Sequence, residues 1–566
     1  MIVVCPLHAT IPSSHNDVNC LRADGNVILR FVNRTKLIFP LLFVSGLVAR
    51  LSLSMMSIQV LIGKFLSDDA YYYFVIARNV ARGCGASFDG TSLTNGFHPL
   101  FVALLAPLFR FMNGNSDLPI HCALALLSIF DCLAGYLIYR ILRAISDERG
   151  ALIGSCFWLL NPCLFFVSLT GTEASLCAFC VACAILLYAA LTERHELDTR
   201  RTVLLGAVTG MAVLARSDSI FLLAAFLVGF LTHRGIGMKK RLGASAALCC
   251  AAILVCAPWL IWNLAHFGTI RQVSGVVKPY IQRLLFLKEG GAYDVAHLTV
   301  KLLSSLKATY VMIATSSGVR IAGFTAFLIA IVSALIHSKE EQVRNARHTI
   351  AVVLLYIALI FLFYSLYFWH IQAWYFHSML MALSIPLGWA SSLWIGRLGR
   401  RAGNAWGIAL AAVMAVAVMN GYRHWRIGFY PWQQTYYQLA HELGDRFKDQ
   451  GRFAAFNAGA YGYYSSVPLI NMDGLVNNKA LEAMRQRTLF TDFLRDQRVS
   501  YVMDHEYIVK MYWGLFGTGR MEDRLKLLAA IQTPWVFSDQ SSARIVIYEV
   551  AGSAAGPERE AAFTSR

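Results

Sequence analysis

The sequence has 566 residues, of which 57% are hydrophobic and only 15% are charged. A soluble protein carries about 25% charged residues, so this composition excludes an ordinary soluble enzyme and indicates a protein with many membrane spans. The net charge of +17 does not indicate a nucleic-acid partner, because the basic residues lie in short clusters between apolar runs, where they orient a protein in a bilayer.

The chain begins with a polar segment. Residues 1–36 lack the short apolar core and cleavage site of a signal peptide. Four basic residues between positions 22 and 36 precede the first apolar run, near Leu37–Gly63. Positive charge favours the cytoplasmic side, so residues 1–36 are predicted to form a cytoplasmic tail.

Two adjacent acids follow the first predicted span, in the motif SDDAYYYFVIARNVARG, residues 67–83. Ser67 is suited to cap a helix whose first turn holds Asp68 and Asp69, and the helix dipole favours their ionised form there. Tyr72 and Arg78 lie further along the same helix. The acids are therefore candidates for chemistry, and the alternative is that they only cap a helix at the membrane exit.

The motif TNGFHPLF, residues 94–101, comes next, with Asn95 and His98 in a polar turn. It leads into the apolar segment Pro99–Met112, which is too short to cross a bilayer. We expect this segment to lie along the outer interface. The alternative for the motif is a plain loop that ends at a proline, although this does not account for the histidine.

The remaining apolar runs predict about eleven transmembrane helices, which leaves the C-terminus outside the cell. In this topology the basic clusters of the short loops all lie on the cytoplasmic side. The expected module covers residues 37–421, with outer loops 64–117 and 264–317. After the first span, the predicted spans lie near 118–139, 151–170, 174–192, 202–217, 219–233, 243–263, 318–337, 349–369, 376–396 and 405–421.

Further polar residues fall on the same outer side. Glu173 lies at one outer hairpin, and Arg216 and Asp218 lie at another, where a simple interfacial ion pair is the alternative. Arg271 and Lys278 belong to the outer loop 264–317, where they either bind an anionic lipid head group or are solvated.

A sixth outer segment, HIQAWYFH, contains Tyr375 and His377 at a predicted membrane boundary. Both are candidates for substrate contact. Aromatic residues at this depth more often form an interfacial belt, which is the alternative.

The composition changes after residue 421. Residues 422–550 mix polar helices with the strand-like runs Phe453–Phe456, Pro468–Asn471 and Ala543–Val550, which predicts a small extracytoplasmic α/β domain. Asn471, Asp473 and Asn477 are suited to bind sugar hydroxyls, although a turn after a strand explains them as well. Residues 551–566 are predicted to be a disordered tail.

No motif for ATP binding, zinc hydrolysis or a serine nucleophile is found, so an activated substrate carried by the membrane fits better. The motifs SDDAYYYFVIARNVARG and TNGFHPL, in this order, resemble the first outer loop of bacterial GT-C-type glycosyltransferases. These are relatives of the protein O-mannosyltransferase, aminoarabinose transferase and arabinofuranosyltransferase families. GTEASLCAF, AVLARSDSIFLL, APWLIWNLAHFGTI and AWYFHSMLMALSIPLG extend the resemblance, and NAGAYGYYSSVPLINMDGLVNN resembles the outer-domain segment of one bacterial subgroup.

The resemblance implies an inverting transfer of a sugar from a polyprenyl phosphate to a hydroxyl of a cell-envelope glycan, glycolipid or protein. The reaction takes place on the outer face of the bacterial inner membrane. One acid of the pair is then the general base, Asp68 before Asp69. Lys278, Arg271, Arg216 and His98 are then expected to stabilise the leaving phosphate, and Glu173 to orient the site. The remaining donor-binding candidates are Asn95, Tyr72, Arg78, Asp218, Tyr375 and His377. No cofactor or metal site is required, although a divalent cation is compatible with paired acids.

Two other functions fit the same composition. A flippase of lipid-linked sugars needs charged residues in mid-span, and Arg50 is the clearest of these; it is also a candidate for facing the donor phosphate. A non-catalytic membrane protein that binds glycans through its outer domain is the second alternative.

Overall fold

The computed structural model describes residues 37–112, 117–193, 197–233, 235–337, 344–397, 399–447, 451–517, 521, 524–533 and 544–551. The predicted N-terminal tail, residues 1–36, and all but the first residue of the predicted C-terminal tail, residues 551–566, lie outside the described residues.

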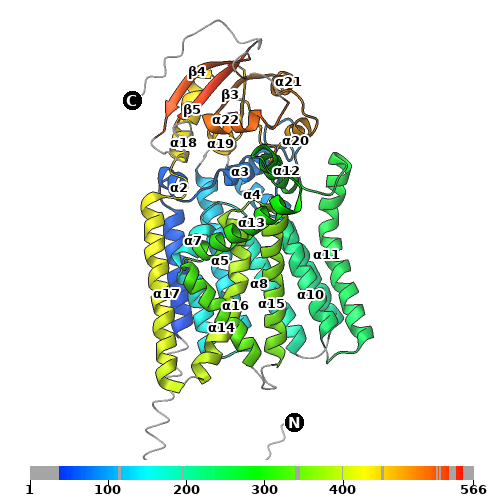
Figure 1. Cartoon of the computed structure of the whole chain (residues 1–566), viewed down its shortest axis with the longest axis vertical. Coiled ribbons are helices and arrows are strands. Elements are labelled where there is room, and N and C mark those ends of the chain that lie inside the picture. Colours follow the sequence, from blue (N-terminus) through cyan, green and yellow to red (C-terminus); the bar gives the residue numbers. More distant parts are fainter. Residues whose placement is uncertain are drawn as a thin grey trace, which may run out of the picture.

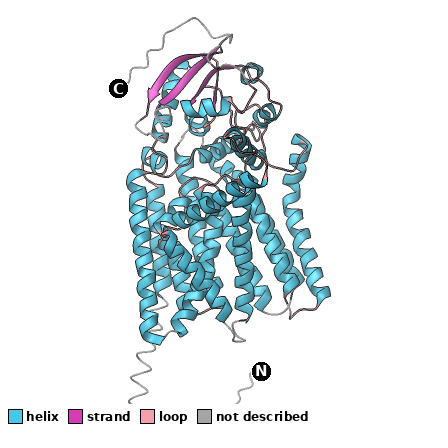
Figure 2. Cartoon of the chain, in the orientation of Figure 1, coloured by secondary structure: helices cyan, strands magenta, loops and turns pink. Residues whose placement is uncertain are grey.

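A bundle of long helices carries a small sheet domain at one end (Figure 1), and helices make up nearly all of the bundle (Figure 2). The first described helix, Leu37–Ser54, enters at the lower end, and the last bundle helix leaves at the upper end, below the sheet domain. An odd number of crossings is consistent with this arrangement. The long helices of the bundle are Leu37–Ser54, α5 (Leu118–Ile145), α6 (Glu148–Leu160), α7 (Pro162–Ser168), α8 (Ala174–Glu193), α9 (Thr199–Ala215), α10 (Ile220–Thr232), α11 (Met238–Phe267), α14 (Ile321–His337), α15 (Arg344–Leu362), α16 (His377–Arg397) and α17 (Gly399–Ile427).

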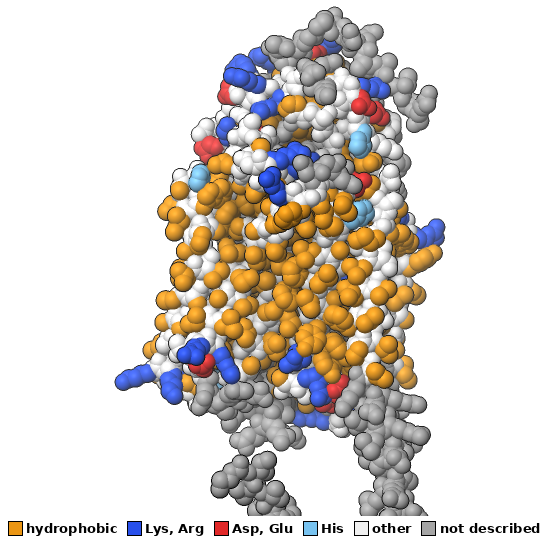
Figure 3. Space-filling view, turned by 180° about the vertical axis from the view of Figure 1, so that it is seen from behind, with side chains coloured by type: hydrophobic (Ala, Val, Ile, Leu, Met, Phe, Trp, Pro, Cys, Tyr) orange, Lys and Arg blue, Asp and Glu red, His pale blue; other side chains and the backbone are white. Residues whose placement is uncertain are grey.

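On the face shown in Figure 3, an apolar belt covers the bundle between two ends that carry charged side chains. Among the described residues, seven helices are long and apolar enough to cross a membrane, or nine if each of two bent helix pairs is one span. Every predicted span is mainly helical, which confirms the polytopic helical fold, but the spans near 37–63 and 151–170 each contain two helices. The count of eleven crossings stays a prediction. α17 has only 11% of its apolar window buried inside the protein, as expected for a helix that faces lipid.

The centre of the bundle is formed by α8 and α16, each with 72% of its apolar window buried. Glycines allow α16 to approach α6: a Cβ added to Gly388 would lie 2.5 Å from the carbonyl oxygen of Gly150. Gly150 and Gly154 are one helical turn apart and line this contact, the small-residue spacing that brings membrane helices together.

The segments expected as outer loops are largely helical. They lie between the bundle and the sheet domain (Figure 1). They contain α2 (Ile58–Lys64), α3 (Asp68–Ala81), α4 (Pro99–Phe111), α12 (Val273–Lys288) and α13 (Val295–Ser316). α4 has only 13 residues, in agreement with the segment predicted to be too short to span.

The C-terminal domain is built on one five-stranded sheet of order β2-β1-β3-β5-β4. β1 pairs in parallel with β2 and β3, whereas β5 pairs antiparallel with β3 and β4. The three predicted strands correspond to β1, β2 and β5, and sequence reasoning missed β3 and β4. The elements are α18 (Gln433–Phe447), β1 (Arg452–Ala455), α19 (Gly459–Tyr464), β2 (Leu469–Asn471), α20 (Asn478–Arg485), α21 (Phe490–Asp496), β3 (Val499–His505), α22 (Glu506–Trp513), β4 (Leu525–Gln532) and β5 (Arg544–Val550).

Candidate active site

A cavity of about 740 Å³ lies where the bundle meets the layer of short outer helices. Its walls come from α3, the start of α4, the α9–α10 turn, α11, α12 and the η3–η4 segment, where η3 is Phe363–Phe368 and η4 is Ala373–Phe376. The polar and charged residues of its lining are Asp69, Tyr72, Tyr73, His98, Thr172, Glu173, Arg216, Ser217, Asp218, Arg271, Gln272, Ser274, Lys278, Tyr280, Arg283, Tyr364, Tyr367, Tyr375 and Arg485. The cavity therefore contains most of the sequence-predicted residues.

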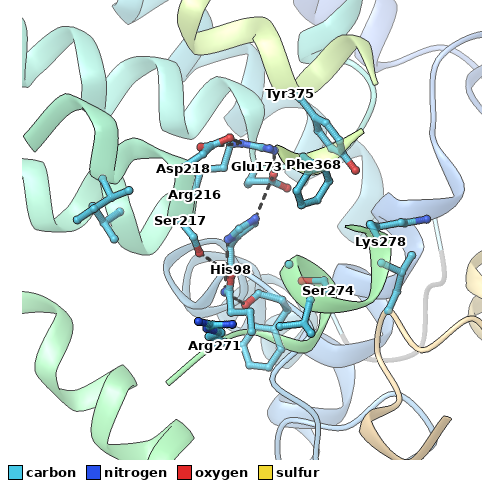
Figure 4. Close-up of a pocket in the computed structure, with 18 of the residues that line it drawn as sticks. His98, Glu173, Arg216, Ser217, Asp218, Arg271, Ser274, Lys278, Phe368 and Tyr375 are labelled. Atoms are coloured by element: carbon cyan, nitrogen blue, oxygen red, sulfur yellow. Dashed lines mark hydrogen bonds and ion pairs between the residues drawn. The ribbon is translucent and has the colours of Figure 1, made fainter. Parts of the chain in front are cut away.

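Arg216 is the centre of a buried ionic network in this cavity (Figure 4). Its guanidinium donates to Glu173 at 2.5 Å and to Asp218 at 3.0 Å. A third N–H donates to the hydroxyl of Tyr364 at 2.7 Å, and the group lies 4.8 Å from the centre of the Tyr375 ring. The planar fork of an arginine can hold two carboxylates at once, so Arg216 fixes the outer hairpins relative to each other.

His98 contacts the same network from α4. It is the N-cap residue of α4, and its Nε2 lies 3.6 Å from the Glu173 carboxylate. Burial lowers the pKa of His98, while the charge of Glu173 opposes that shift. The preceding carbonyl, of Phe97, accepts a hydrogen bond from Gln272, which ties this turn to the start of α12.

The two acids of α3 point in different directions. Ser67 caps the helix as predicted, with Asp68 and Asp69 in the first turn. Successive residues of an α-helix are rotated by about 100°, so adjacent side chains do not share a face. Asp69 lines the cavity, whereas Asp68 turns to the sheet domain.

The Asp69 carboxylate faces the open cavity and, within the described part of the chain, has no hydrogen-bond or ion-pair partner. Burial raises its pKa, and the charge of Glu173 adds to that shift. Lys278 and Arg216 oppose it. A carboxylate with a raised pKa and free lone pairs is suited to accept a proton.

Asp68 instead binds the first turn of α19. Its two carboxylate oxygens accept hydrogen bonds from the backbone N–H groups of Gly459, at 3.0 Å, and Ala460, at 2.9 Å. Burial raises the pKa of Asp68 to about 7, although the two hydrogen bonds oppose this. The carboxylate therefore joins the sheet domain to α3 and does not line the cavity.

Two predicted cations reach the cavity from α12 and the turn before it. Lys278 and Arg271 lie on different sides of the ionic network (Figure 4). Arg283 and Arg485 add positive charge to the lining. Arg216 is already balanced by two acids, so these four cations give the cavity a net attraction for anions.

Three predicted ligands lie elsewhere. Asn95 accepts hydrogen bonds from Val273 and Asn478 and donates to the carbonyl of Arg271. Arg78 donates to the carbonyls of the last turn of α19. Both residues therefore position neighbouring segments and do not line the cavity, which corrects the expectation that they bind the donor.

His377, the third, is buried in the bundle. Its Nε2 contacts the Asp131 carboxylate at 2.7 Å, and Arg50 contacts the same carboxylate at 2.7 Å. Arg50 also donates to the carbonyl of Leu159. Arg50 and His377 therefore belong to one buried ionic network and do not face the cavity, contrary to expectation.

Tyr72 lines the cavity, but its hydroxyl forms hydrogen bonds with the sheet domain. It donates to the carbonyl of Phe456 and accepts from Asn471 and from the N–H of Ala458. Asn477 caps α20.

Asp473 accepts from the N–H of Leu475, and burial raises its pKa to about 6. Asn471 likewise accepts from the N–H of Gly474. Asn471, Asp473 and Asn477 thus form the turn after a strand that the sequence offered as the alternative to sugar binding.

Sequence reasoning also missed several polar groups of the cavity, and two of them, Tyr364 and Gln272, connect segments that are distant in the chain. Tyr364 lies in an apolar run, where it resembled a belt or core residue. Its hydroxyl donates to Asp218. Gln272 accepts from Ser217 at 2.5 Å and donates to Phe97. Neither contact has a local sequence signal, because each joins segments far apart in the chain.

The residues do not fit a divalent metal ion. No group of three or more His, Cys, Asp or Glu side chains is arranged to hold one among the described residues. Glu173 and Asp218 are both held by Arg216. We therefore derive no step through a metal.

Two family models match the chain. Residues 97–262 match the model of dolichyl-phosphate-mannose-protein mannosyltransferases, a range that contains His98, Glu173, Arg216 and Asp218. Residues 423–548 match a domain of unknown function, DUF8728, which corresponds to the sheet domain. A comparison with curated protein sequences finds no significant match.

Solved structures of membrane glycosyltransferases share the fold. The oligosaccharyltransferase of Archaeoglobus fulgidus, solved with zinc and sulfate, superposes with a TM-score of 0.56 at 15% identity, covering 87% of this chain and 72% of that one. AglB of the same organism, solved with an inhibitory peptide and a dolichol-phosphate, superposes with a TM-score of 0.54 at 13% identity. The match covers 86% of this chain and 72% of that one. ArnT from Cupriavidus metallidurans, bound to undecaprenyl phosphate, superposes with a TM-score of 0.55 at 12% identity. The match covers 92% of this chain and 99% of that one. The family model matches the cavity-forming helices, and the chain shares the fold of these GT-C-type membrane glycosyltransferases.

Proposed function

We propose that the protein transfers a sugar from a polyprenyl phosphate to a hydroxyl of a cell-envelope glycan, glycolipid or protein, with inversion at the anomeric carbon. The solved relatives with dolichol-phosphate and undecaprenyl phosphate support a lipid-linked donor. Apolar residues at the ends of bundle helices line part of the cavity, among them Leu214, Phe221 and Leu260. In this proposal the lipid chain stays in the bilayer while the sugar enters the cavity.

Asp69 is the general base of this proposal, in place of Asp68. It is the carboxylate that opens into the cavity without a partner among the described residues, and this observation carries the assignment. As the acceptor oxygen bonds to the anomeric carbon, its proton passes to Asp69. The bond from that carbon to the phosphate oxygen breaks, and one displacement inverts the configuration.

The leaving group is a lipid phosphate whose negative charge grows as the bond breaks. Lys278 and Arg271 are the cations proposed to stabilise it, as fixed charges placed where charge develops. His98 donates to the phosphate from the opposite wall. Glu173 and Asp218 act through Arg216, whose position they hold.

The proposed orientation puts the cavity and the sheet domain on the outer face of a bacterial inner membrane, with the N-terminal side in the cytoplasm. Lys and Arg side chains gather at the opposite end of the bundle (Figure 3), which supports that end as the cytoplasmic one.

The test is a transfer assay with purified full-length protein in lipid nanodiscs. Polyprenyl phosphates carrying mannose, glucose, arabinose or galacturonic acid are supplied together with membrane glycolipid extracts, and released polyprenyl phosphate is measured. Asp69→Asn should lower the rate about 100- to 10,000-fold. Asp68→Asn, which weakens the contact with α19 but leaves the cavity lining intact, should lower the rate far less.

Full activity of Asp69→Asn contradicts the assignment of the base. Movement of lipid-linked sugar across a bilayer without release of polyprenyl phosphate contradicts the transferase and favours a flippase.

A further inference from the structure

A second hollow, of about 530 Å³, lies where the sheet domain meets the loop between α3 and α4. Three cations line it, Arg452 at the start of β1, Lys479 at the start of α20 and Arg498 before β3. Thr91 and Ser92 of the α3–α4 loop form the facing wall. The hollow thus combines five segments that are distant in sequence.

The charge of this hollow is positive. Its lining contains one acidic residue, Asp496, and three basic residues. Within the described residues, the side chains of Lys479 and Arg498 have no ion-pair partner, and Arg452 donates only to the carbonyl of Gln497. Arg498 also adopts a left-handed φ of 53°, which is unusual for a residue other than glycine.

Two segments connect the hollow to the active-site cavity. α20 carries Lys479 near its start and Arg485, which lines the cavity, at its end. At a rise of about 1.5 Å per residue, the two positions are separated by about 9 Å along the helix. The α3–α4 loop likewise runs from Ser92 in the hollow to His98 in the cavity.

Hydrogen bonds hold these two segments together. The Thr94 hydroxyl donates to the side chain of Asn478 at 3.0 Å, and the Asn478 amide donates to Asn95 at 3.0 Å. The segments that line both the hollow and the cavity are therefore held to each other, with about 9 Å of α20 between Lys479 and Arg485.

We propose that the hollow binds an anionic group, a carboxylate or a phosphate, of an oligosaccharide acceptor whose far end receives the sugar. This inference rests on the proposed transfer reaction and specifies its acceptor class. The cations attract the acid group through water-exposed contacts, so the interaction weakens as salt screens it. It assigns to Lys479 and Arg498 the acceptor contact that the sequence had suggested for Asn471, Asp473 and Asn477.

Binding is tested without donor, on the full-length protein in zwitterionic nanodiscs. The probes are trigalacturonate, inorganic phosphate and neutral maltotriose, measured by calorimetry at low and high salt. We expect trigalacturonate to bind in a salt-dependent manner, with about tenfold weaker binding in the double variant Lys479→Gln, Arg498→Gln. Binding of phosphate would extend the site to phosphorylated glycans.

The matched control is Arg524→Gln, Lys526→Gln, the same loss of two charges at β4, on the opposite edge of the sheet. Equal weakening in both double variants overturns the inference, as does equal binding of maltotriose or no binding of either anion.

The two proposals fail separately. If the anions bind but no polyprenyl phosphate is released with any donor, the transfer reaction is wrong while the anion site stands. If transfer proceeds but Lys479→Gln, Arg498→Gln uses acidic acceptors as well as wild type does, the anion site alone is wrong.

Discussion

The carboxylate of Asp68 accepts a hydrogen bond of 3.0 Å from the backbone N–H of Gly459, a residue 391 positions later in the chain. This contact fixes α3 to the sheet domain through one acid of the pair. The neighbouring acid, Asp69, is then held toward the cavity by the same helix. Two adjacent carboxylates thus have two different roles, because a helix sends adjacent side chains to different faces.

The buried carboxyl groups should contribute more stability as the pH falls from 8 to 5, against the opposite contribution of buried histidines such as His505, whose pKa burial lowers to about 4. Burial raises the pKa of Asp68 to about 7, and those of Asp473 and Asp504 to about 6. A raised carboxyl pKa contributes stability that is complete below the unfolded value near 4 and is lost as the pH rises through the folded value. Melting temperatures of wild type and Asp68→Asn, measured by thermal unfolding between pH 5 and 8, test this dependence.

We expect the melting temperature of wild type, relative to that of Asp68→Asn, to rise as the pH falls from 8 to 5. A slope of the same size in both proteins would show that Asp68 does not titrate in this range.

Replacement of Gly459 should loosen the sheet domain. A Cβ at this position would lie 2.2 Å from the carbonyl oxygen of Asp68 and 2.8 Å from its carboxylate. We expect Gly459→Ala to cost about 1–3 kcal/mol of unfolding free energy, as overpacking does elsewhere, and to reduce transfer. Thermal unfolding measures the first effect and the nanodisc assay the second.

Gly407 of α17 offers the control, because nothing lies within 4 Å of an added Cβ there. Gly407→Ala should keep both stability and activity. An unchanged melting temperature in Gly459→Ala would contradict a tight contact between α3 and α19.

Removal of Lys278 should move the pH profile of transfer. The charge of Lys278 lowers the pKa of Asp69, so Lys278→Met lets that pKa rise. A base must be ionised to act, and the acidic limb of kcat/KM should therefore shift to higher pH. The maximal rate should also fall, by about 10- to 1,000-fold, because the leaving phosphate loses a cation.

Lys288, at the end of the same helix, is the matched control, and Lys288→Met should keep the wild-type profile. A shift of the acidic limb to lower pH in Lys278→Met would show that Asp69 is not the titrating base.

Loss of Asp131 should destabilise the bundle. Asp131→Ala leaves Arg50 buried without its partner, which costs about 3–5 kcal/mol in comparable sites. Arg50→Met combined with Asp131→Leu should recover much of that stability, because no buried charge remains. Thermal unfolding of the three proteins in detergent measures this.

The assignment of this network to stability requires that transfer per folded molecule stays near the wild-type rate in the double variant. A stable double variant without transfer would give the network a functional role.

The local parts of the site were predictable from sequence. The cap at Ser67, the acids in the first turn of α3 and the short apolar helix after His98 each depend on neighbouring residues, and the structure has them as expected. The outer placement of Glu173 and Arg216 followed from the alternation of apolar spans, and these residues meet in one cavity.

The long-range parts were not predictable. Asp68 seemed the better base because the sequence around it does not indicate a partner near residue 459. His377 lies in an aromatic segment typical of a membrane boundary, yet it contacts Asp131 on another helix, 246 positions away. Pairings of this kind depend on how helices pack, which a single sequence does not encode locally.

The separation between Asp68 and Gly459 also sets an order of assembly. A chain is synthesised from its N-terminus at about 5–20 residues per second, so roughly 20–80 s pass between the synthesis of these two residues. During that time α3 lacks the backbone donors that hold it. The lining of the cavity also includes Leu475 and Arg485, so its wall stays incomplete until these late residues have been synthesised.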